Sequence, residues 1–212
     1  MPPALKPAVF ICLFPILKNL FSILLYTGVR IGEAGALKWS DIDYMNGVIH
    51  ITKTMTFGKE FTREIGTPKT KASERDIPLN DDIMAVLRRQ REQQRQKEKN
   101  KILSIENLIF TTVYGHYLNS DSLGKEIQRL TDKAGIERFT VHAFRDTFAT
   151  RFYENGGDPQ ILKSLLGHSS LQMTMDLYSQ VLPKRKAEEM QKIVTIHTFF
   201  GTSRKRSSRG SA

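Results

Sequence analysis

Apolar runs separated by polar turn signals divide the chain into short elements. Residues 19–26 (NLFSILLY) are apolar on nearly all sides, which is typical of a buried helix, and Thr27-Gly28 predicts a break after it. Residues 31–39 (IGEAGALKW) predict a second helix, with Ser40 offering turn or cap chemistry behind it. The pattern therefore places two helices in close succession near the start of the chain.

β-branched residues dominate the next part of the sequence. Residues 47–56 (GVIHITKTMT) partly alternate in polarity, and residues 61–67 and 75–79 have the composition of two more strands. The segment 67–74 (TPKTKASE) is polar and indicates an exposed turn. We therefore predict a small three-stranded antiparallel sheet built from these three strand segments.

Helical periodicity returns after Asn80, a residue type that caps helix N-termini. Gly135 then marks a helix end, and Asp158-Pro159 marks a helix start. The predicted helices cover 81–99, 119–134, 141–155, a short segment from Pro159, a segment that begins at Ser169 or Ser170 and carries Tyr178, and 184–193. The expected fold class is α+β and mainly α: a helical domain with one small three-stranded antiparallel sheet between two groups of helices.

The formal net charge of the 212-residue chain is +10, which points to nucleic acid or another anionic partner. Residues 88–101 carry seven cations and two anions, and residues 201–212 carry four cations. The rest of the chain therefore has a net charge of only +1, so an argument for DNA binding depends on individual cations. Within 88–101 the charges alternate with Gln and Glu around the helix, which predicts a mainly solvated face.

Cys12 is the only cysteine, so the chain has no internal disulfide, which fits a reducing intracellular compartment. Residues 8–17 (AVFICLFPIL) are apolar, but Pro15 and Lys18 interrupt them well short of the roughly 20 residues that a membrane span needs. No small-residue cleavage site follows, so we do not expect a signal peptide. We expect most of this run to form a buried helix that leads into the helix at 19–26.

Four polar residues stand out against this framework. Arg30 directly follows the break after the first helix, and His142 and Arg145 are three residues apart, which places them on one helix face. These two lie roughly a quarter-turn from the apolar stripe that Phe144 begins, so they should flank the core at the lip of a cleft. His168 lies in a short loop between two helices. Taken singly, each has an ordinary structural explanation as a surface, core or turn residue.

Together with a tyrosine, these residues fall into five segments that follow one another in order. The segments are Thr27-Gly-Val-Arg-Ile-Gly-Glu33, Pro68-Lys-Thr-Lys-Ala-Ser-Glu-Arg75, His142-Ala-Phe-Arg-Asp-Thr-Phe-Ala-Thr150, Leu166-Gly-His168 and Thr174-Met-Asp-Leu-Tyr178. This set resembles the active site of the tyrosine recombinases, or phage-integrase family. The resemblance implies a catalytic domain at 17–193, preceded by residues 1–16, which do not look family-like, and followed by a basic tail at 194–212 that we expect to be disordered.

The resemblance implies a site-specific DNA recombinase or integrase that breaks and rejoins strands through a 3′-phosphotyrosyl intermediate. Tyr178 would be the nucleophile. Arg30 and Arg145 would hold the phosphate oxygens, because guanidinium groups match phosphate with two parallel hydrogen bonds. His168 would donate a further hydrogen bond. The family often has histidine where this chain has Asp146 and Gln180, neither of which is a core position of its active site.

Proton transfer also follows from the resemblance. The family's general acid is a lysine on the turn between two strands, and both Lys69 and Lys71 qualify. Lys69 is favoured, because the family's lysine begins the Lys-Thr pair at this turn. His142 would assist proton removal from the tyrosine or bind a phosphate oxygen, and Glu33 would support the residues that contact the substrate.

The implied partners are double-stranded DNA and other recombinase subunits in a tetrameric synapse, with no membrane and no small-molecule substrate. No cofactor is expected, since the covalent link conserves the energy of the broken bond. No metal is expected, since His142 and His168 lack a zinc-ligand pattern. We expect a cytoplasmic protein that is encoded by a bacterium or a phage.

The main alternative is a truncated relative that binds DNA or a full-length recombinase without efficient recombination. Family members usually carry an N-terminal helical domain that clamps DNA, whereas only 29 residues precede Arg30 here. The complete set of motif residues favours an active enzyme. A generic basic DNA-binding protein would explain the charge but not the ordered motifs, and a type IB topoisomerase shares the chemistry but not these motif wordings.

Overall fold

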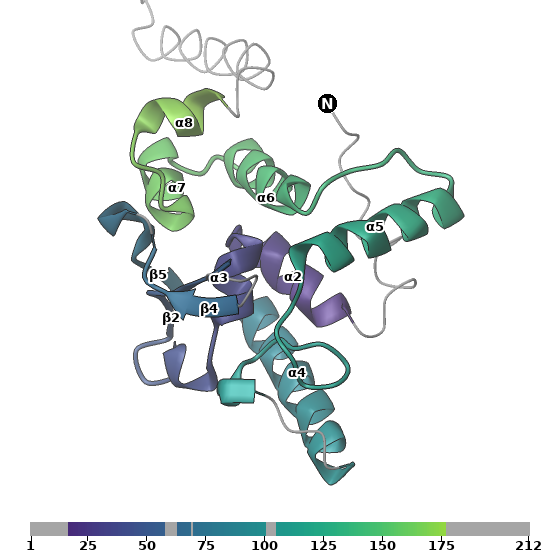
Figure 1. Cartoon of the computed structure of the whole chain (residues 1–212). Coiled ribbons are helices and arrows are strands. Elements are labelled where there is room, and N and C mark those ends of the chain that lie inside the picture. The colour runs from purple at the N-terminus through teal and green to yellow at the C-terminus, as the bar shows by residue number, and fades with distance from the viewer. Residues whose placement is uncertain (1–16, 58–62, 69, 101–104, 177–212) are drawn as a thin grey trace, which may run out of the picture. The chain divides into compact units, whose positions relative to one another are not determined.

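The computed structural model describes residues 17–57, 63–68, 70–100 and 105–176 (Figure 1). Its helices are α2 (Lys18–Thr27), α3 (Ile31–Ala36), α4 (Asp81–Lys99), α5 (Ser120–Ala134), α6 (His142–Glu154), α7 (Pro159–Leu166) and α8 (Leu171–Asp176). Short 3-10 turns occupy Trp39–Asp41, Lys71–Ser73 and Ile105–Asn107. The strands are β1 (Ile42–Asp43), β2 (Val48–Ile51), β3 (Thr54–Phe57), β4 (Arg63–Gly66) and β5 (Arg75–Pro78).

Helix α2 packs against both α4 and α6, as its apolar sequence predicts. Phe21 of α2 stacks on Phe144 of α6, with ring centroids 4.8 Å apart and planes 13° from parallel. Leu20 and Leu24 are buried beside them. Each fully buried side chain of this size contributes about 1.5–3 kcal/mol of transfer free energy. The core that holds the first and third motif segments together is therefore the contact between α2 and α6.

Several predicted helix ends agree with the structure, whereas the helix predicted at 31–39 already ends at Ala36. The Asn80 side chain accepts a hydrogen bond from the Ile83 amide at 2.8 Å and caps α4. The Asp158 side chain caps α7 in the same way, with a proline at the first turn of the helix. Gly28 ends α2 with φ of 64°, a left-handed conformation that favours glycine. These local signals place the loops that carry Arg30 and His168.

The predicted fold class, mainly helical with a small three-stranded antiparallel sheet, is confirmed, but the sheet has different members. The three-stranded sheet has the order β1-β2-β5. The predicted strand at 47–56 is two strands, β2 and β3, and β3 pairs with β4 in a separate two-stranded ribbon. The segment expected at 61–67 therefore does not join the sheet, and β1 takes the edge position instead.

Packing on α3 explains why the long strand divides. A Cβ atom added to Gly32 of α3 would lie 2.8 Å from the Thr54 side-chain oxygen and 3.1 Å from the Met55 carbonyl oxygen. Strand β3 thus leaves the sheet and lies directly on the glycine face of α3. Alternation of polarity gives the face of a strand but not its partner, so the sequence pattern could not distinguish one strand from two.

The basic half of α4 is only partly solvated. Gln90 and Gln94 are buried, and their side-chain amides donate to the Ile109 and Leu108 carbonyl oxygens at 2.7 Å. Trp39 Nε1 donates to the Gln94 side chain at 2.6 Å. Two buried glutamines one helical turn apart therefore hydrogen-bond to the segment at 108–109 that follows the helix. Most of the charged residues around them are exposed.

Within the described ranges, no helix is long and apolar enough to cross a membrane. The predicted helix at 184–193, the N-terminal segment 1–16 and the tail at 194–212 lie outside the described residues. The division of the chain into these parts stays a prediction.

Candidate active site

The first site element is the turn between α2 and α3. Arg30 occupies the N-cap position of α3, and its backbone amide donates to Glu33 Oε2 at 2.8 Å. Its guanidinium donates to Glu33 Oε1 at 3.0 Å, while the Arg30 side chain remains 37% exposed. Glu33 itself is buried. Arg30 is thus anchored by a carboxylate below it and open to solvent above.

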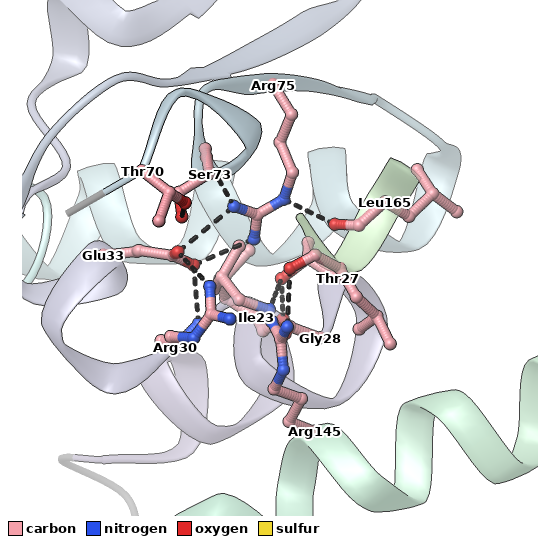
Figure 2. Close-up of polar contacts among 12 residues, drawn as sticks. Ile23, Thr27, Gly28, Arg30, Glu33, Thr70, Ser73, Arg75, Arg145 and Leu165 are labelled. Atoms are coloured by element: carbon pink, nitrogen blue, oxygen red, sulfur yellow. Dashed lines mark hydrogen bonds and ion pairs between the residues drawn. The ribbon is translucent and has the colours of Figure 1, made fainter. Parts of the chain in front are cut away.

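Glu33 has a second arginine partner, Arg75, to which the motif resemblance gives no role. Arg75, the first residue of β5, donates to Glu33 Oε1 at 3.1 Å and to Oε2 at 2.8 Å (Figure 2). Burial alone would raise the pKa of Glu33, but hydrogen bonds and charges from Arg75 and Arg30 outweigh it and lower that pKa. The signal for Arg75 was present in the strand pattern, since Arg75 and the buried Ile77 are two residues apart and share a face.

Arg145 is buried rather than placed at the lip of a cleft, which corrects the expectation from helical spacing. Only 2% of the residue is exposed. Its Nη1 donates to the Gly28 carbonyl oxygen at 2.7 Å (Figure 2). Its Nη2 donates to the Leu166 carbonyl oxygen at 2.5 Å. Because Gly28 lies at the end of α2 and Leu166 at the end of α7, this one side chain joins the Arg30 turn to the His168 turn.

No carboxylate forms an ion pair with Arg145 among the described residues. Burial, followed by the charge of Arg30, lowers the pKa of Arg145 to about 9. The group still carries its proton at neutral pH. It is therefore a buried cation that makes no direct ion pair among the described residues, although the charges of Glu33 and Asp146 partly oppose the lowering of its pKa. Such a group favours the approach of an anion.

His168 follows Gly167, the C-cap residue of α7, and is also buried. Its Nδ1 lies 2.9 Å from the Thr174 hydroxyl oxygen, and Thr174 is fully buried in α8. Burial, followed by the positive charges of Arg145 and Arg30, lowers the pKa of His168 to about 4. The imidazole is therefore neutral at neutral pH, with Nε2 as the ring nitrogen that Thr174 does not contact. Thr174 begins the fifth motif segment, but its spacing in the sequence does not predict this contact.

His142 lies at the first position of α6, and its side chain is 63% exposed. Its electrostatic interaction with His168 contributes to the lowered pKa of that residue, so the two histidines belong to the same cluster. Asp146, one turn further, has its Oδ1 at 3.7 Å from His142 Nε2. Within the described residues, that buried oxygen has no hydrogen-bond partner. The structure therefore brings together Arg30, His142, Arg145 and His168.

Two of the predicted site residues lie outside the described ranges: Lys69 and Tyr178. Lys71 begins the 3-10 turn between β4 and β5, but its side chain is not among those described. Among the described residues, no group of three or more histidine, cysteine or acidic side chains could hold a metal ion. The assignment of a nucleophile and of a general acid stays a prediction.

The arrangement suits an anion with several oxygens. Each guanidinium has five N–H donors. The hydrogen bonds to protein groups described above use one of them on Arg30 and two on Arg145. The remaining donors, with the nitrogen of a neutral His168, can bind phosphate oxygens bidentately. Fixed cations in a partly dry site are the arrangement that stabilises extra negative charge on a phosphate.

Comparison with known proteins gives a match over most of the chain. Residues 15–185 match the profile of the Phage integrase family. A protein of Caldanaerobacter subterraneus named "Tyrosine recombinase XerC-like" is 31% identical over 198 residues, covering 87% of this chain and 50% of that protein. The "Transposase from transposon Tn916" of Enterococcus faecalis is 25% identical over 177 residues, covering 81% of this chain and 44% of that protein.

Solved structures agree with these matches. The Tn1549 transposon integrase in complex with transposon right end DNA superposes with a TM-score of 0.76 at 25% identity, covering 92% of this chain and 65% of that chain. The chain spans about half the length of the curated relatives it matches.

Proposed function

The chain belongs to the phage integrase family, and on that basis we propose that it is a tyrosine recombinase that breaks and rejoins DNA strands. The reaction joins a DNA 3′-phosphate to the oxygen of Tyr178 and releases a 5′-hydroxyl. Attack by a second 5′-hydroxyl reverses the step and regenerates the tyrosine. The covalent link conserves the energy of the broken phosphodiester bond, so rejoining needs no nucleoside triphosphate.

The observation that carries this proposal is the setting of Arg145. A cation that is 98% buried, held by two backbone carbonyl oxygens and lacking a carboxylate partner among the described residues has a large desolvation cost. An anionic substrate that accepts hydrogen bonds from its remaining N–H groups would offset that cost. A DNA phosphate placed between Arg145 and the half-exposed Arg30 meets this requirement.

The steps follow from the chemistry of each group. Arg30 and Arg145 stabilise the added charge on the phosphate as the Tyr178 oxygen attacks. We assign to His168 the tautomer that carries its proton on Nε2. In this tautomer Nδ1 accepts a hydrogen bond from the Thr174 hydroxyl, and Nε2–H donates to a phosphate oxygen.

Proton transfer completes the proposed reaction. His142, exposed at the start of α6, accepts the tyrosine proton or binds the phosphate. The lysine at position 69 gives a proton to the leaving 5′-oxygen, which is otherwise a poor leaving group.

The proposed partners are double-stranded DNA and further recombinase subunits bound to the same site. A solved relative, the Tn1549 integrase, is described in complex with DNA, which supports the first of these. We propose that the reaction takes place inside a bacterial cell, where the DNA substrate is located. The alternative, a DNA-binding relative without efficient recombination, is less well supported, because Arg30, Arg145 and His168 keep one connected geometry.

The experiment is incubation of the chain with a nicked suicide DNA substrate, in which the cleaved fragment is lost and the covalent adduct accumulates. A protein–DNA adduct should form with the wild type and be absent with Tyr178→Phe. Peptide mapping should place the DNA on Tyr178. If the wild type binds DNA but gives no adduct, the chain is not an active recombinase on that substrate and the alternative gains.

A further inference from the structure

We propose that Arg75 is a positioning residue of this site, tying the turn that follows Lys69 to both the Arg30 turn and the His168 turn. The proposal rests on the proposed recombinase function. Arg75 lies at the start of β5, and its side chain is 4% exposed. No role for this residue follows from the substrate-binding chemistry described above.

The hydrogen bonds of Arg75 show why it does not bind the phosphate. Its Nη1 donates to Glu33 Oε1 and to the Ser73 carbonyl oxygen, at 3.1 and 2.9 Å. Its Nη2 donates to Glu33 Oε2 at 2.8 Å, and its Nε to the Leu165 carbonyl oxygen at 2.5 Å. Four of its five N–H donors are thus used by the protein, and its charge is paired with a buried carboxylate. Arg75 therefore acts through other residues.

Those partners belong to three separate pieces of the site (Figure 2). Glu33 holds Arg30 through the Arg30 amide and guanidinium. Ser73 ends the 3-10 turn that directly precedes β5. Leu165 lies beside Leu166, whose carbonyl oxygen binds Arg145. Two arginines from distant parts of the chain therefore hold adjacent carbonyls at the end of α7, which Gly167 separates from His168.

Close packing at Gly167 supports a fixed contact between the two turns. A Cβ atom at Gly167 would lie 3.0 Å from Arg75 Nη1, 3.1 Å from the Ala72 carbonyl oxygen and 3.2 Å from the Ser73 Cα atom. The Thr70 and Ser73 hydroxyls are 3.0 Å apart, which closes the turn on itself. Ala72 and Ser73 thus pack against Gly167, the residue that precedes His168, and Arg75 links the two turns.

The consequence for chemistry concerns the proton given to the leaving 5′-oxygen. Without Arg75, the turn beside Lys69 loses its connection to the groups that hold the phosphate. A misplacement of about 1 Å in a reacting group can cost about a hundredfold in rate. The deficit should depend on whether the leaving group needs a proton, because the contacts of Arg145 to Gly28 and Leu166 do not involve Arg75.

The test is single-turnover cleavage of two DNA substrates, one ordinary and one with a 5′-bridging sulfur, which leaves without a proton. Arg75→Met should cleave ordinary DNA about a hundredfold more slowly than wild type. On the sulfur substrate the cleavage rate of Arg75→Met should be within about tenfold of the wild-type rate. Arg145→Met should be impaired on both. Arg138→Met is the matched control, since Arg138 pairs with Asp132 on the surface, its side chain is 63% exposed, and this change should alter neither rate.

Arg75→Lys keeps the buried positive charge opposite Glu33, but the lysine ammonium cannot also bind the Ser73 and Leu165 carbonyl oxygens. This variant therefore tests the positioning role if Arg75→Met does not fold. Arg75→Lys should slow cleavage of ordinary DNA less than Arg75→Met does, and its cleavage rate should likewise be restored on the 5′-sulfur substrate. Wild-type rates for a folded Arg75→Met, or for Arg75→Lys where Arg75→Met does not fold, would overturn the proposal. An equal deficit on both substrates would overturn it too. Absence of an adduct with the wild-type chain would instead refute the proposed function.

Discussion

Replacing Glu33 by glutamine tests whether one buried carboxylate holds the site together. Glu33 accepts two hydrogen bonds from Arg30 and two from Arg75, at 2.8 to 3.1 Å. Glutamine has a single oxygen, turns an NH₂ group toward these donors and leaves the Arg75 charge buried without its partner. Removing one member of a buried ion pair costs about 3–5 kcal/mol. We expect Glu33→Gln to lose that amount from the free energy of unfolding.

A double-mutant cycle separates the ion pair from general damage. Arg75→Met leaves Glu33 buried without its main partner and should lose a similar amount on its own. The double variant removes both charges of the pair, so its loss should be close to that of either single variant. The coupling free energy should therefore be about 3–5 kcal/mol. The surface pair of Arg138 with Asp132 is the control, and Asp132→Asn should cost no more than about 1 kcal/mol.

Urea unfolding followed by far-UV circular dichroism measures each free energy. The pH dependence gives a second check, because the pKa of Glu33 is lowered by folding. A lowered pKa stabilises the fold above the ordinary value of 4.5, and this contribution is lost as pH falls through the folded-state pKa. The difference between wild type and Glu33→Gln should therefore stay constant from pH 7 to about 5 and shrink at lower pH. Additive losses in the cycle would refute the reasoning.

Four further outcomes are expected. Folding lowers the pKa of His168 from 6.5 to about 4, so protonation of this residue opposes folding below pH 6.5. The free energy of unfolding should decrease by up to about 3 kcal/mol between pH 6.5 and pH 4. His168→Asn should abolish this loss in urea unfolding measured at each pH. Thr174→Val should slow adduct formation about tenfold by freeing the His168 tautomer, and Thr174→Ser should restore it. Gly28→Ala should lower the free energy of unfolding by about 2–4 kcal/mol in thermal melts, because its φ is 64° and its new Cβ would lie 2.9 Å from a Leu166 methyl carbon. Lys69→Ala should slow cleavage of ordinary DNA but not of 5′-sulfur DNA, and the same behaviour from Lys71→Ala alone would reverse that assignment.

The sequence identified most of the elements because their signals are local. Asn80 caps α4 through its own side chain, and Gly28 ends α2 through its own backbone conformation. The buried face of α2 could be predicted from composition, since nearly every position in 19–26 is apolar. Such properties depend on a few neighbouring residues, so they can be predicted from the sequence without any tertiary information.

The sheet shows where local reasoning stops. Residues 47–56 have the composition of one strand, yet β2 and β3 belong to different sheets because Gly32 and its helix accept β3 as a neighbour. The same limit applied to Arg145. Helical spacing placed it beside the core, whereas 2% exposure places it within the protein, held by carbonyls from α2 and α7.

By itself, the sequence determined the family resemblance, the order of the motif segments and the residue types that can bind a phosphate. Only the tertiary structure decided which of those residues meet and what holds them. The pairing of Arg75 with Glu33, 42 positions apart, and the contact of His168 with Thr174 exist because β5, α3, α7 and α8 are packed together. Periodicity specifies which face of an element is buried, but the partner of that face depends on the packing of the whole core.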